Sequence, residues 1–388
     1  MADETNTPPR AARGGAMAEG AVRDRPDAAP AAQPERPVPV SAAAPERLDA
    51  ASASSPERLD AVSAVPPERL DRFMRRAASA YYAGREPFGA GGDFTTAPEM
   101  TQAFGECIGL WAAIAWQAMG RPDPVELGPG RGTLMADALR AVAEMAPGFR
   151  AALRVHLVET SPRLREVQAD RLGTAVRAWH DDLGALPAGP AIVIANEFLD
   201  ALPIRQFIRR GGGWMERFVT DGGFTESPAR DAPALPPDAP EGAVQEVNEA
   251  ALAIRVATQG GVALFIDYGP GAGGLGDSLQ AIAAHGRADP LGPPGEADIT
   301  AHVDFAALGA AAQAAGAAVQ GPMPQGVFLA RLGLFSRAAI LARMDPAHAA
   351  RHLAAAQRLA APEHMGRLFK AVCLCHPDLP PLPGFEDP

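Results

Sequence analysis

The fold of this chain is decided by one stretch, Val125-Glu126-Leu127-Gly128-Pro129-Gly130-Arg131-Gly132-Thr133. It starts with the apolar pattern of a buried strand, runs straight into a glycine-rich turn, and then continues as a helix. Glycines at positions 128, 130 and 132 allow positive φ angles and let a ligand approach the main chain with no Cβ in the way. The stretch therefore predicts a loop that binds a nucleotide cofactor.

The spacing of the three glycines distinguishes between two classes of cofactor. A dinucleotide fingerprint, G-x-G-x-x-G, would need its third glycine at Thr133, whereas the glycine comes one residue earlier, at Gly132. The spacing matches the E/D-x-G-x-G-x-G motif of class I S-adenosylmethionine (SAM) methyltransferases, in which an acidic residue opens the motif. We therefore expect Glu126, Gly128, Gly130 and Gly132 to bind SAM. An NAD-dependent oxidoreductase is the alternative.

Acidic residues follow the next two predicted strands. Glu159 ends the apolar strand 154–159, where a carboxylate can accept hydrogen bonds from both hydroxyls of a ribose. Because dinucleotide folds use a carboxylate in the same way, Glu159 alone does not separate SAM from NAD. Asp181 and Asp182 come after the short strand 175–179, and either could bind the amino group of adenine. The alternative is that this pair caps a turn.

The fourth predicted strand, 191–195, delivers three polar side chains to the same edge of the sheet: Asn196, Glu197 and Asp200. Ligands of open α/β sheets bind outside the carboxyl ends of the strands, so we expect the methyl acceptor here. Carboxylates suit a cationic acceptor, because a guanidinium can be held by an acid and must lose a proton as its nitrogen attacks the methyl group. The alternative is that Glu197 and Asp200 begin a helix, where acidic residues are favoured by the dipole.

Six blocks of sequence occur in collinear order between about Tyr81 and the C-terminus. They are Gly92-Asp93-Phe94-Thr95-Thr96-Ala97-Pro98-Glu99, Phe104-Gly105-Glu106, 126–135, Asn196-Glu197-Phe198-Leu199-Asp200-Ala201-Leu202-Pro203, Asp267-Tyr268-Gly269 and 294–305. Together these blocks resemble the signatures of the MidA-like methyltransferases, the bacterial and mitochondrial relatives of the complex I assembly factor that methylates arginine. Met100 and Leu199 depart from the pattern, and neither change removes a polar group.

The resemblance implies a SAM-dependent protein arginine N-methyltransferase whose target is a subunit of the respiratory NADH dehydrogenase, complex I. It also implies that Asp93, Thr95 and Glu99, in the leading block, close over the cofactor cleft. A catalytically silent assembly factor that keeps the fold for binding is a second alternative. Every glycine and carboxylate named above is present, which disfavours a decayed site.

The alternation of strands and helices predicts an α/β fold of the Rossmann-like class I methyltransferase type, a mostly parallel sheet with helices on both faces. Residues 1–65 are rich in Ala, Pro and Ser, carry two copies of the repeat Pro-Glu-Arg-Leu-Asp, and should be disordered. Residues 66–120 should form a helical leading segment or lid. The methyltransferase domain should span 121–388, with insertions near 204–240 and 270–300, the first of which contains a β-hairpin. Segments 326–330 and 369–374 are expected to close the sheet as an antiparallel pair.

Charge and composition exclude several classes of function. The net charge is −11 and Lys370 is the only lysine, so no nucleic-acid footprint is expected. Three cysteines give no disulfide framework, and no metal site is predicted. No stretch reaches the roughly 18 apolar residues that a membrane span needs, and no secretory signal is evident. We therefore expect a cytoplasmic enzyme with a protein substrate, while the oligomeric state stays open.

Overall fold

The computed structural model describes residues 66–84, 95–120, 123–248, 261–284 and 286–386. The chain divides into two units, residues 1–48 and 49–388, and all described residues belong to the second. The predicted disordered tail, residues 1–65, lies outside the described residues. No helix within the described ranges is long and apolar enough to cross a membrane.

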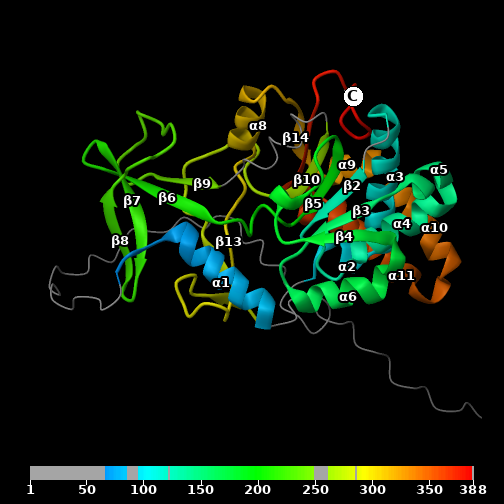
Figure 1. The fold of residues 1–388 in the computed structure, drawn as a ribbon, viewed down its shortest axis with the longest axis horizontal. Helices are drawn as coiled ribbons and strands as arrows, with labels where there is room; N and C mark the ends of the chain where they lie inside the picture. Colours follow the sequence, from blue (N-terminus) through cyan, green and yellow to red (C-terminus); the bar gives the residue numbers. More distant parts are fainter. Residues whose placement is uncertain (1–65, 85–94, 121–122, 249–260, 285, 387–388) are drawn as a thin grey trace, which may run out of the picture. The chain divides into compact units, whose positions relative to one another are not determined.

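The centre of the described chain is a seven-stranded sheet in the order β14-β15-β10-β5-β2-β3-β4 (Figure 1). Its strands are β2 (Asp123–Leu127), β3 (Val155–Val158), β4 (Val176–His180), β5 (Ala191–Asn196), β10 (Val262–Tyr268), β14 (Ala318–Pro324) and β15 (Phe369–Cys375). The strands β10, β5, β2, β3 and β4 are parallel, and only β15 runs antiparallel to its neighbours. This order and direction confirm the predicted class I methyltransferase fold.

Helices pack against both faces of this sheet because successive strand residues point to opposite sides. On β5, Ile192 and Ile194 face one apolar core and Val193 faces another. The first core is covered by α3 (Gln102–Ala118), α9 (Gln325–Arg331), α10 (Leu334–Met344), α11 (Ala349–Ala360) and α12 (Met365–Leu368). The second core includes α8 (Phe305–Ala314). Nearer β3, the helices α4 (Thr133–Met145) and α6 (Pro162–Leu172) enclose a smaller core, while α5 (Pro147–Ala152) packs its Phe149 into the first.

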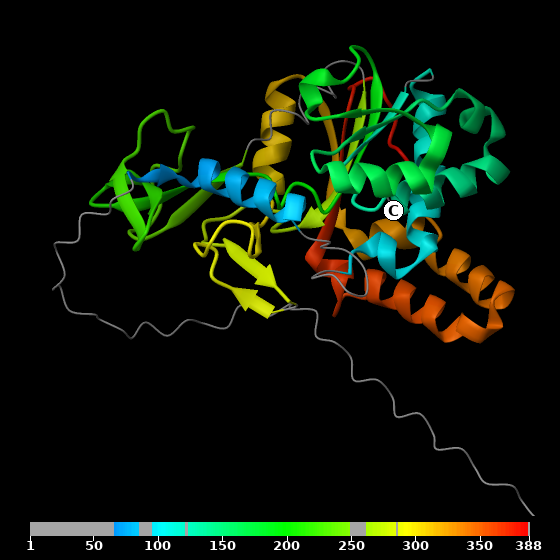
Figure 2. The same ribbon diagram turned by 60° about the horizontal axis from the view of Figure 1, so that its bottom comes forward.

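The inserted residues form two further sheets. One has the order β1-β7-β6-β9 with β8 paired to β7, from the strands β1 (Glu68–Arg69), β6 (Ile204–Arg210), β7 (Gly213–Thr220), β8 (Gly223–Pro228) and β9 (Val244–Asn248). The β6–β7 pair is the predicted hairpin. The other sheet contains β11 (Gln280–Ala283), β12 (Gly286–Ala288) and β13 (Asp298–Thr300), seen clearly in Figure 2. The helix α1 (Leu70–Gly84) packs its apolar face against both sheets.

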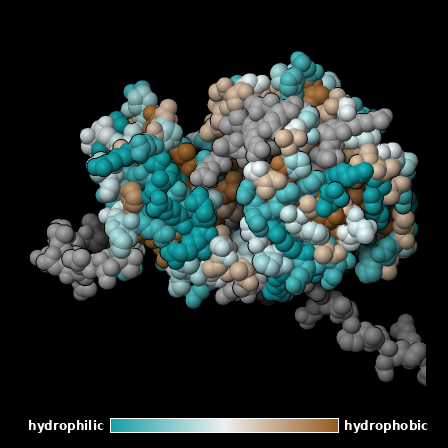
Figure 3. Space-filling view, in the orientation of Figure 1, coloured by the Kyte–Doolittle hydropathy of each residue, from teal (hydrophilic) through white to brown (hydrophobic). Residues whose placement is uncertain are grey.

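The proline-rich loop after β8 lies on the first inserted sheet. Arg209 donates a hydrogen bond to the Pro237 carbonyl and the Trp214 indole donates one to Pro236. Ion pairs such as Arg210–Glu226 neutralise neighbouring side chains on the same sheet. Figure 3 shows that hydrophilic residues cover this region on the face in view.

One predicted strand was wrong. Residues 326–330 belong to the helix α9, and the strand that pairs with β15 is β14. Gly326 lets this helix pack closely against α11, because a Cβ there would come within 2.0 Å of the Ala360 carbonyl oxygen. The strand β14 contains Pro322 and Pro324, which suggest a loop. They are tolerated because β14 is the edge strand of the sheet and is interrupted by a bulge.

Candidate functional site

The glycine loop has the backbone geometry that its sequence predicts. Gly128, Gly130 and Gly132 have φ angles of 59°, 53° and 73°, and α4 begins directly after them. The Gly128 N–H donates to the Val158 carbonyl at 3.2 Å, which joins the loop to the end of β3. A Cβ on Gly128 would come within 2.8 Å of the Phe198 ring, so no larger residue fits there without movement. Glu126 lies on β2 between β3 and β5.

Glu159 lies directly after β3 and is only 8% exposed. Its carboxylate accepts hydrogen bonds from the Ser161 N–H at 2.8 Å and from the Gln168 amide at 3.3 Å. Burial raises its pKa, against the effect of these hydrogen bonds. Gln168 was not predicted from the sequence. Its amide also donates to the Gly130 carbonyl at 2.7 Å, so one fully buried side chain links the glycine loop to the predicted ribose-binding acid.

The two aspartates after β4 have different environments. Asp182 accepts hydrogen bonds from the N–H groups of Gly184 at 2.6 Å and Ala185 at 3.2 Å, so it caps the turn that follows. Asp181 forms an ion pair with Arg165 at 2.7 Å. Both aspartates are exposed, and the turn-capping alternative therefore describes Asp182.

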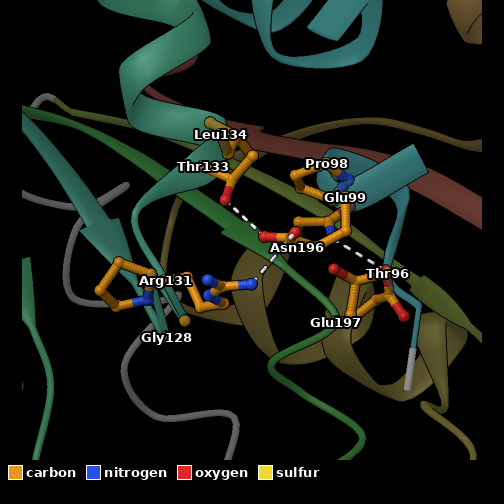
Figure 4. A pocket seen from close by; sticks show the side chains of 11 residues that line it. Thr96, Pro98, Glu99, Gly128, Arg131, Thr133, Leu134, Asn196 and Glu197 are labelled. Carbon is orange, nitrogen blue, oxygen red and sulfur yellow. Dashed lines mark hydrogen bonds and ion pairs between the residues drawn. The ribbon is translucent and has the colours of Figure 1, made fainter. Parts of the chain in front are cut away.

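A pocket lies between the glycine loop, the short helix α2 (Ala97–Met100) and the end of β5 (Figure 4). It encloses about 420 Å³, including space open to solvent, and is lined by Thr96, Pro98, Glu99, Gly128, Pro129, Gly130, Arg131, Thr133, Leu134, Asn196 and Glu197. The carboxylate of Glu99 accepts a hydrogen bond from the Thr133 hydroxyl and lies 3.9 Å from the Arg131 guanidinium. Thr95 is exposed just before α2, and Asp93 lies outside the described residues.

Glu197 is held inside this pocket by two donors. Its Oε1 accepts hydrogen bonds from the Ala97 N–H and from the Asn196 amide, each at 3.1 Å. Burial raises its pKa to about 7; the charge of Asp200 adds to the increase, and the two hydrogen bonds oppose it. A carboxylate with this pKa can exchange a proton near neutral pH.

Residues 197–200 form a turn and not a helix, so the helix-start alternative is wrong. Glu197 has a φ of 52°, a left-handed conformation that is unfavourable for a residue with a Cβ. Asp200 is 7% exposed, and burial raises its pKa to about 6. The atoms Asn196 Oδ1 and Asp200 Oδ1 are buried without a hydrogen-bond partner among the described residues. Of these two residues only Asn196 lines the pocket, and its unpaired buried oxygen suits a ligand that donates hydrogen bonds.

Asp267 belongs to one of the blocks that resemble the family, but no local pattern indicates its role. It lies on β10, next to β5, and its Oδ2 accepts hydrogen bonds from the N–H groups of Phe198, Leu199 and Asp200. Tyr268 follows it, and its hydroxyl bonds to Thr300 at 2.8 Å.

The sheet order, the glycine loop and the acid after β3 define a class I SAM-binding protein. A family model described as an S-adenosyl-L-methionine-dependent methyltransferase matches residues 107–323. The chain belongs to this family, and its cofactor is SAM. The NAD-dependent alternative is therefore wrong.

Named relatives extend over most of the chain. The mitochondrial protein arginine methyltransferase NDUFAF7 of Danio rerio is 34% identical over 347 residues, which cover 77% of this chain and 81% of the relative. The Homo sapiens protein of that name is 33% identical, covering 78% and 77%. A Burkholderia thailandensis protein crystallised with S-adenosyl-homocysteine has a TM-score of 0.68 and 31% identity, covering 83% of this chain and 89% of that one.

These names correct one prediction. The cytoplasmic location expected from the sequence is contradicted, because the curated relatives are named as mitochondrial proteins. The prediction rested only on missing signals in the sequence, and a missing signal is weak support for a compartment.

Proposed function

We propose that this enzyme transfers the methyl group of SAM to a guanidinium nitrogen of an arginine in a protein. The observation that carries the proposal is the half-buried carboxylate of Glu197, which lines the same pocket as the glycine loop. A negative group beside the methyl donor favours a cationic acceptor. The relatives of about one-third identity are named protein arginine methyltransferases, which supports the same acceptor class.

We assign the cofactor to the edge of the sheet formed by the glycine loop and the residues that follow β3 and β4. The loop fits SAM because its three glycines have the positive φ angles of the motif, and the buried carboxylate of Glu159 follows the neighbouring strand, where it could accept hydrogen bonds from ribose hydroxyls. Glu126 begins the motif, and Asp181 is better available for adenine than Asp182, which caps a turn. The assignment of Thr95 and Asp93 to the closing segment rests on the sequence block alone.

SAM supplies an electrophilic methyl group when bound, so the protein residues have mainly to position the acceptor and accept a proton. Glu197 would bind the guanidinium and orient one nitrogen toward the pocket. The unpaired oxygen of Asn196, which lines the pocket, would accept a further N–H group of the acceptor. With pKa values raised to about 7 and about 6, Glu197 and Asp200 are suited to take the proton that the guanidinium nitrogen loses.

The target protein is proposed to be a subunit of the respiratory NADH dehydrogenase. This part rests on the resemblance to the MidA-like family and on the name shared by the relatives. We also propose that residues 66–120 and the insertions near 204–240 and 270–300 shape the access to the acceptor site, since the central sheet supplies only the cofactor and the floor.

The test is transfer of a labelled methyl group from SAM to purified complex I subunits, followed by mass spectrometry of the modified residues. Methylarginine in one subunit, lost in Glu197→Gln, is the expected result. Labelled lysine or histidine would refute the arginine acceptor. SAM binding without transfer to any subunit would favour the silent assembly factor.

A further inference from the structure

The turn that carries Glu197 is held by a residue from the neighbouring strand. Asp267 Oδ2 accepts three backbone hydrogen bonds, from Phe198 at 3.1 Å, Leu199 at 2.8 Å and Asp200 at 3.2 Å. Its Oδ1 accepts a fourth, from the Tyr268 N–H at 2.9 Å. One carboxylate therefore accepts every N–H group of the turn between Glu197 and Ala201.

This arrangement has a specific consequence for Glu197. The residue has a left-handed φ of 52°, and a conformation of that kind persists only where the surroundings determine it. Its own N–H donates to the Ile266 carbonyl at 2.9 Å, and the next three N–H groups donate to Asp267. The backbone on both sides of the Glu197 side chain is thus tied to consecutive residues of β10.

Two neighbours of Asp267, Lys370 and Tyr268, direct their side-chain polar groups elsewhere, while burial and the nearby charges of Asp200 and Glu197 raise the pKa of Asp267. Lys370 lies opposite Asp267 on the neighbouring strand β15, but the Lys370 ammonium donates to the carbonyls of Arg367 and Leu368. Tyr268 contacts Thr300 through its hydroxyl and His302 through its ring. Asp267 is 1% exposed and is not among the residues that line the pocket. It is therefore shielded from any ligand and can act only through the turn.

We propose that Asp267 is the positioning residue of the acceptor site: by binding the N–H groups of residues 198–200, it holds Glu197 in its left-handed conformation with the carboxylate in the pocket. This inference rests on the proposed function, because that function makes Glu197 part of the acceptor site. The hydrogen bonds themselves do not depend on it. Asp267 touches neither cofactor nor acceptor, and so its loss should change the rate of transfer and leave cofactor binding intact.

The experiment compares Asp267→Asn with the wild type and with Glu246→Gln. Glu246 is a half-buried glutamate on β9 whose carboxylate accepts hydrogen bonds from Ser278 and Gln206. An asparagine keeps the size but has one acceptor oxygen in place of two and no negative charge, so it cannot accept all four of these hydrogen bonds and holds the remaining ones more weakly. We expect kcat for methyl transfer to an arginine peptide to fall by about 100-fold, because misplacing a reacting group by about 1 Å has that effect. The Kd for SAM should be unchanged, and Glu246→Gln should retain the wild-type kcat.

Amide hydrogen exchange gives a measurement that does not depend on activity. The N–H groups of Phe198, Leu199 and Asp200 lie outside helices and strands, so without Asp267 they should exchange rapidly. We expect them to be protected in the wild type and to lose protection in Asp267→Asn. Rapid exchange in the wild type would overturn the proposal even if the variant fails to fold.

The remaining outcomes separate the two proposals. A normal kcat in a folded Asp267→Asn enzyme would overturn the positioning role, as would an equal loss of SAM binding and transfer, which indicates a general structural effect. If the wild type transfers no methyl group to arginine, the proposed function fails, and the exchange data still decide whether Asp267 holds the turn.

Discussion

Replacing Glu197 by glutamine should stabilise the folded protein at alkaline pH and remove methyl transfer. Burial raises the pKa of Glu197 from 4.5 to about 7. Because the folded-state pKa of Glu197 is higher than its unfolded-state value, the contribution of Glu197 to the stability of the wild type is fully present below pH 4.5. This contribution is lost as the pH rises through about 7. Because a glutamine side chain does not ionise, the stability of the variant should not decrease in this way as the pH rises.

The size of the effect follows from the shift. A change from 4.5 to about 7 corresponds to about 3 kcal/mol at pH values well above 7. Glu197 is only half-buried, and a glutamine oxygen is a weaker acceptor for the Ala97 N–H, so we expect a gain on the order of 1 kcal/mol near pH 8.5. Near pH 5 the two proteins should differ little, or the wild type should be the more stable.

Urea denaturation at about pH 5 and about pH 8.5, at constant ionic strength, measures this difference. Glu166→Gln, which changes an exposed glutamate on α6, controls for the loss of one carboxylate. Single-turnover transfer on the same samples should show a loss on the order of 10²-fold in Glu197→Gln. A stability difference that is the same at both pH values would refute the argument that Glu197 ionises at a cost in the folded protein.

Three further predictions concern the same site. Gly128→Ala should abolish SAM binding measured by calorimetry. The control is Gly120→Ala, which has a similar φ of 70° but no atom within 4 Å of the new Cβ, and it should bind SAM normally. If the two variants bind SAM with equal affinity, the glycine loop is not part of the cofactor site. Deleting residues 1–60 should leave the affinity for SAM nearly unchanged, because this part of the sequence has few large apolar side chains, and a large loss of affinity would contradict that reasoning. Asp200→Asn should reduce transfer, and combined with Glu197→Gln it should lose less than the product of the two single losses if the acids act as a pair; fully multiplicative losses would show that they act independently.

The geometry of the proposed cofactor site could be predicted because each feature follows from a local pattern. The three glycines at every second position, Gly128, Gly130 and Gly132, are expected to have positive φ angles, and all three have them. Glu159 comes at the end of an apolar strand, and parallel strands end at one edge of the sheet. Gln168 could not be predicted, because its hydrogen bonds to Gly130 and Glu159 arise only when α6 packs beside the loop.

The acceptor half depends on contacts between distant residues. Asp267 binds the Phe198 N–H across 69 residues of sequence, and no local signal announces that pairing. The same limit explains why residues 326–330 are predicted as the strand that pairs with β15, whereas β14 takes that place in the structure. An apolar run of five residues fits a strand or one buried turn of helix, and the local sequence does not decide between them. In the structure the run lies in α9, where Gly326 packs against Ala360 of α11.

Two unfavourable features coincide at Glu197, and together they argue for a chemical role. A left-handed backbone costs on the order of 1 kcal/mol or more for a residue other than glycine, and a buried carboxylate costs more as it ionises. Glycine at position 197 would remove the first cost, and an uncharged side chain would remove the second. Yet Asp267 is dedicated to holding this backbone, and Ala97 and Asn196 donate to this carboxylate. Any buried turn needs acceptors for its N–H groups, but a connection from β5 to β6 does not need a left-handed glutamate with a raised pKa, whereas the proposed site must present one ionisable oxygen to a methyl acceptor.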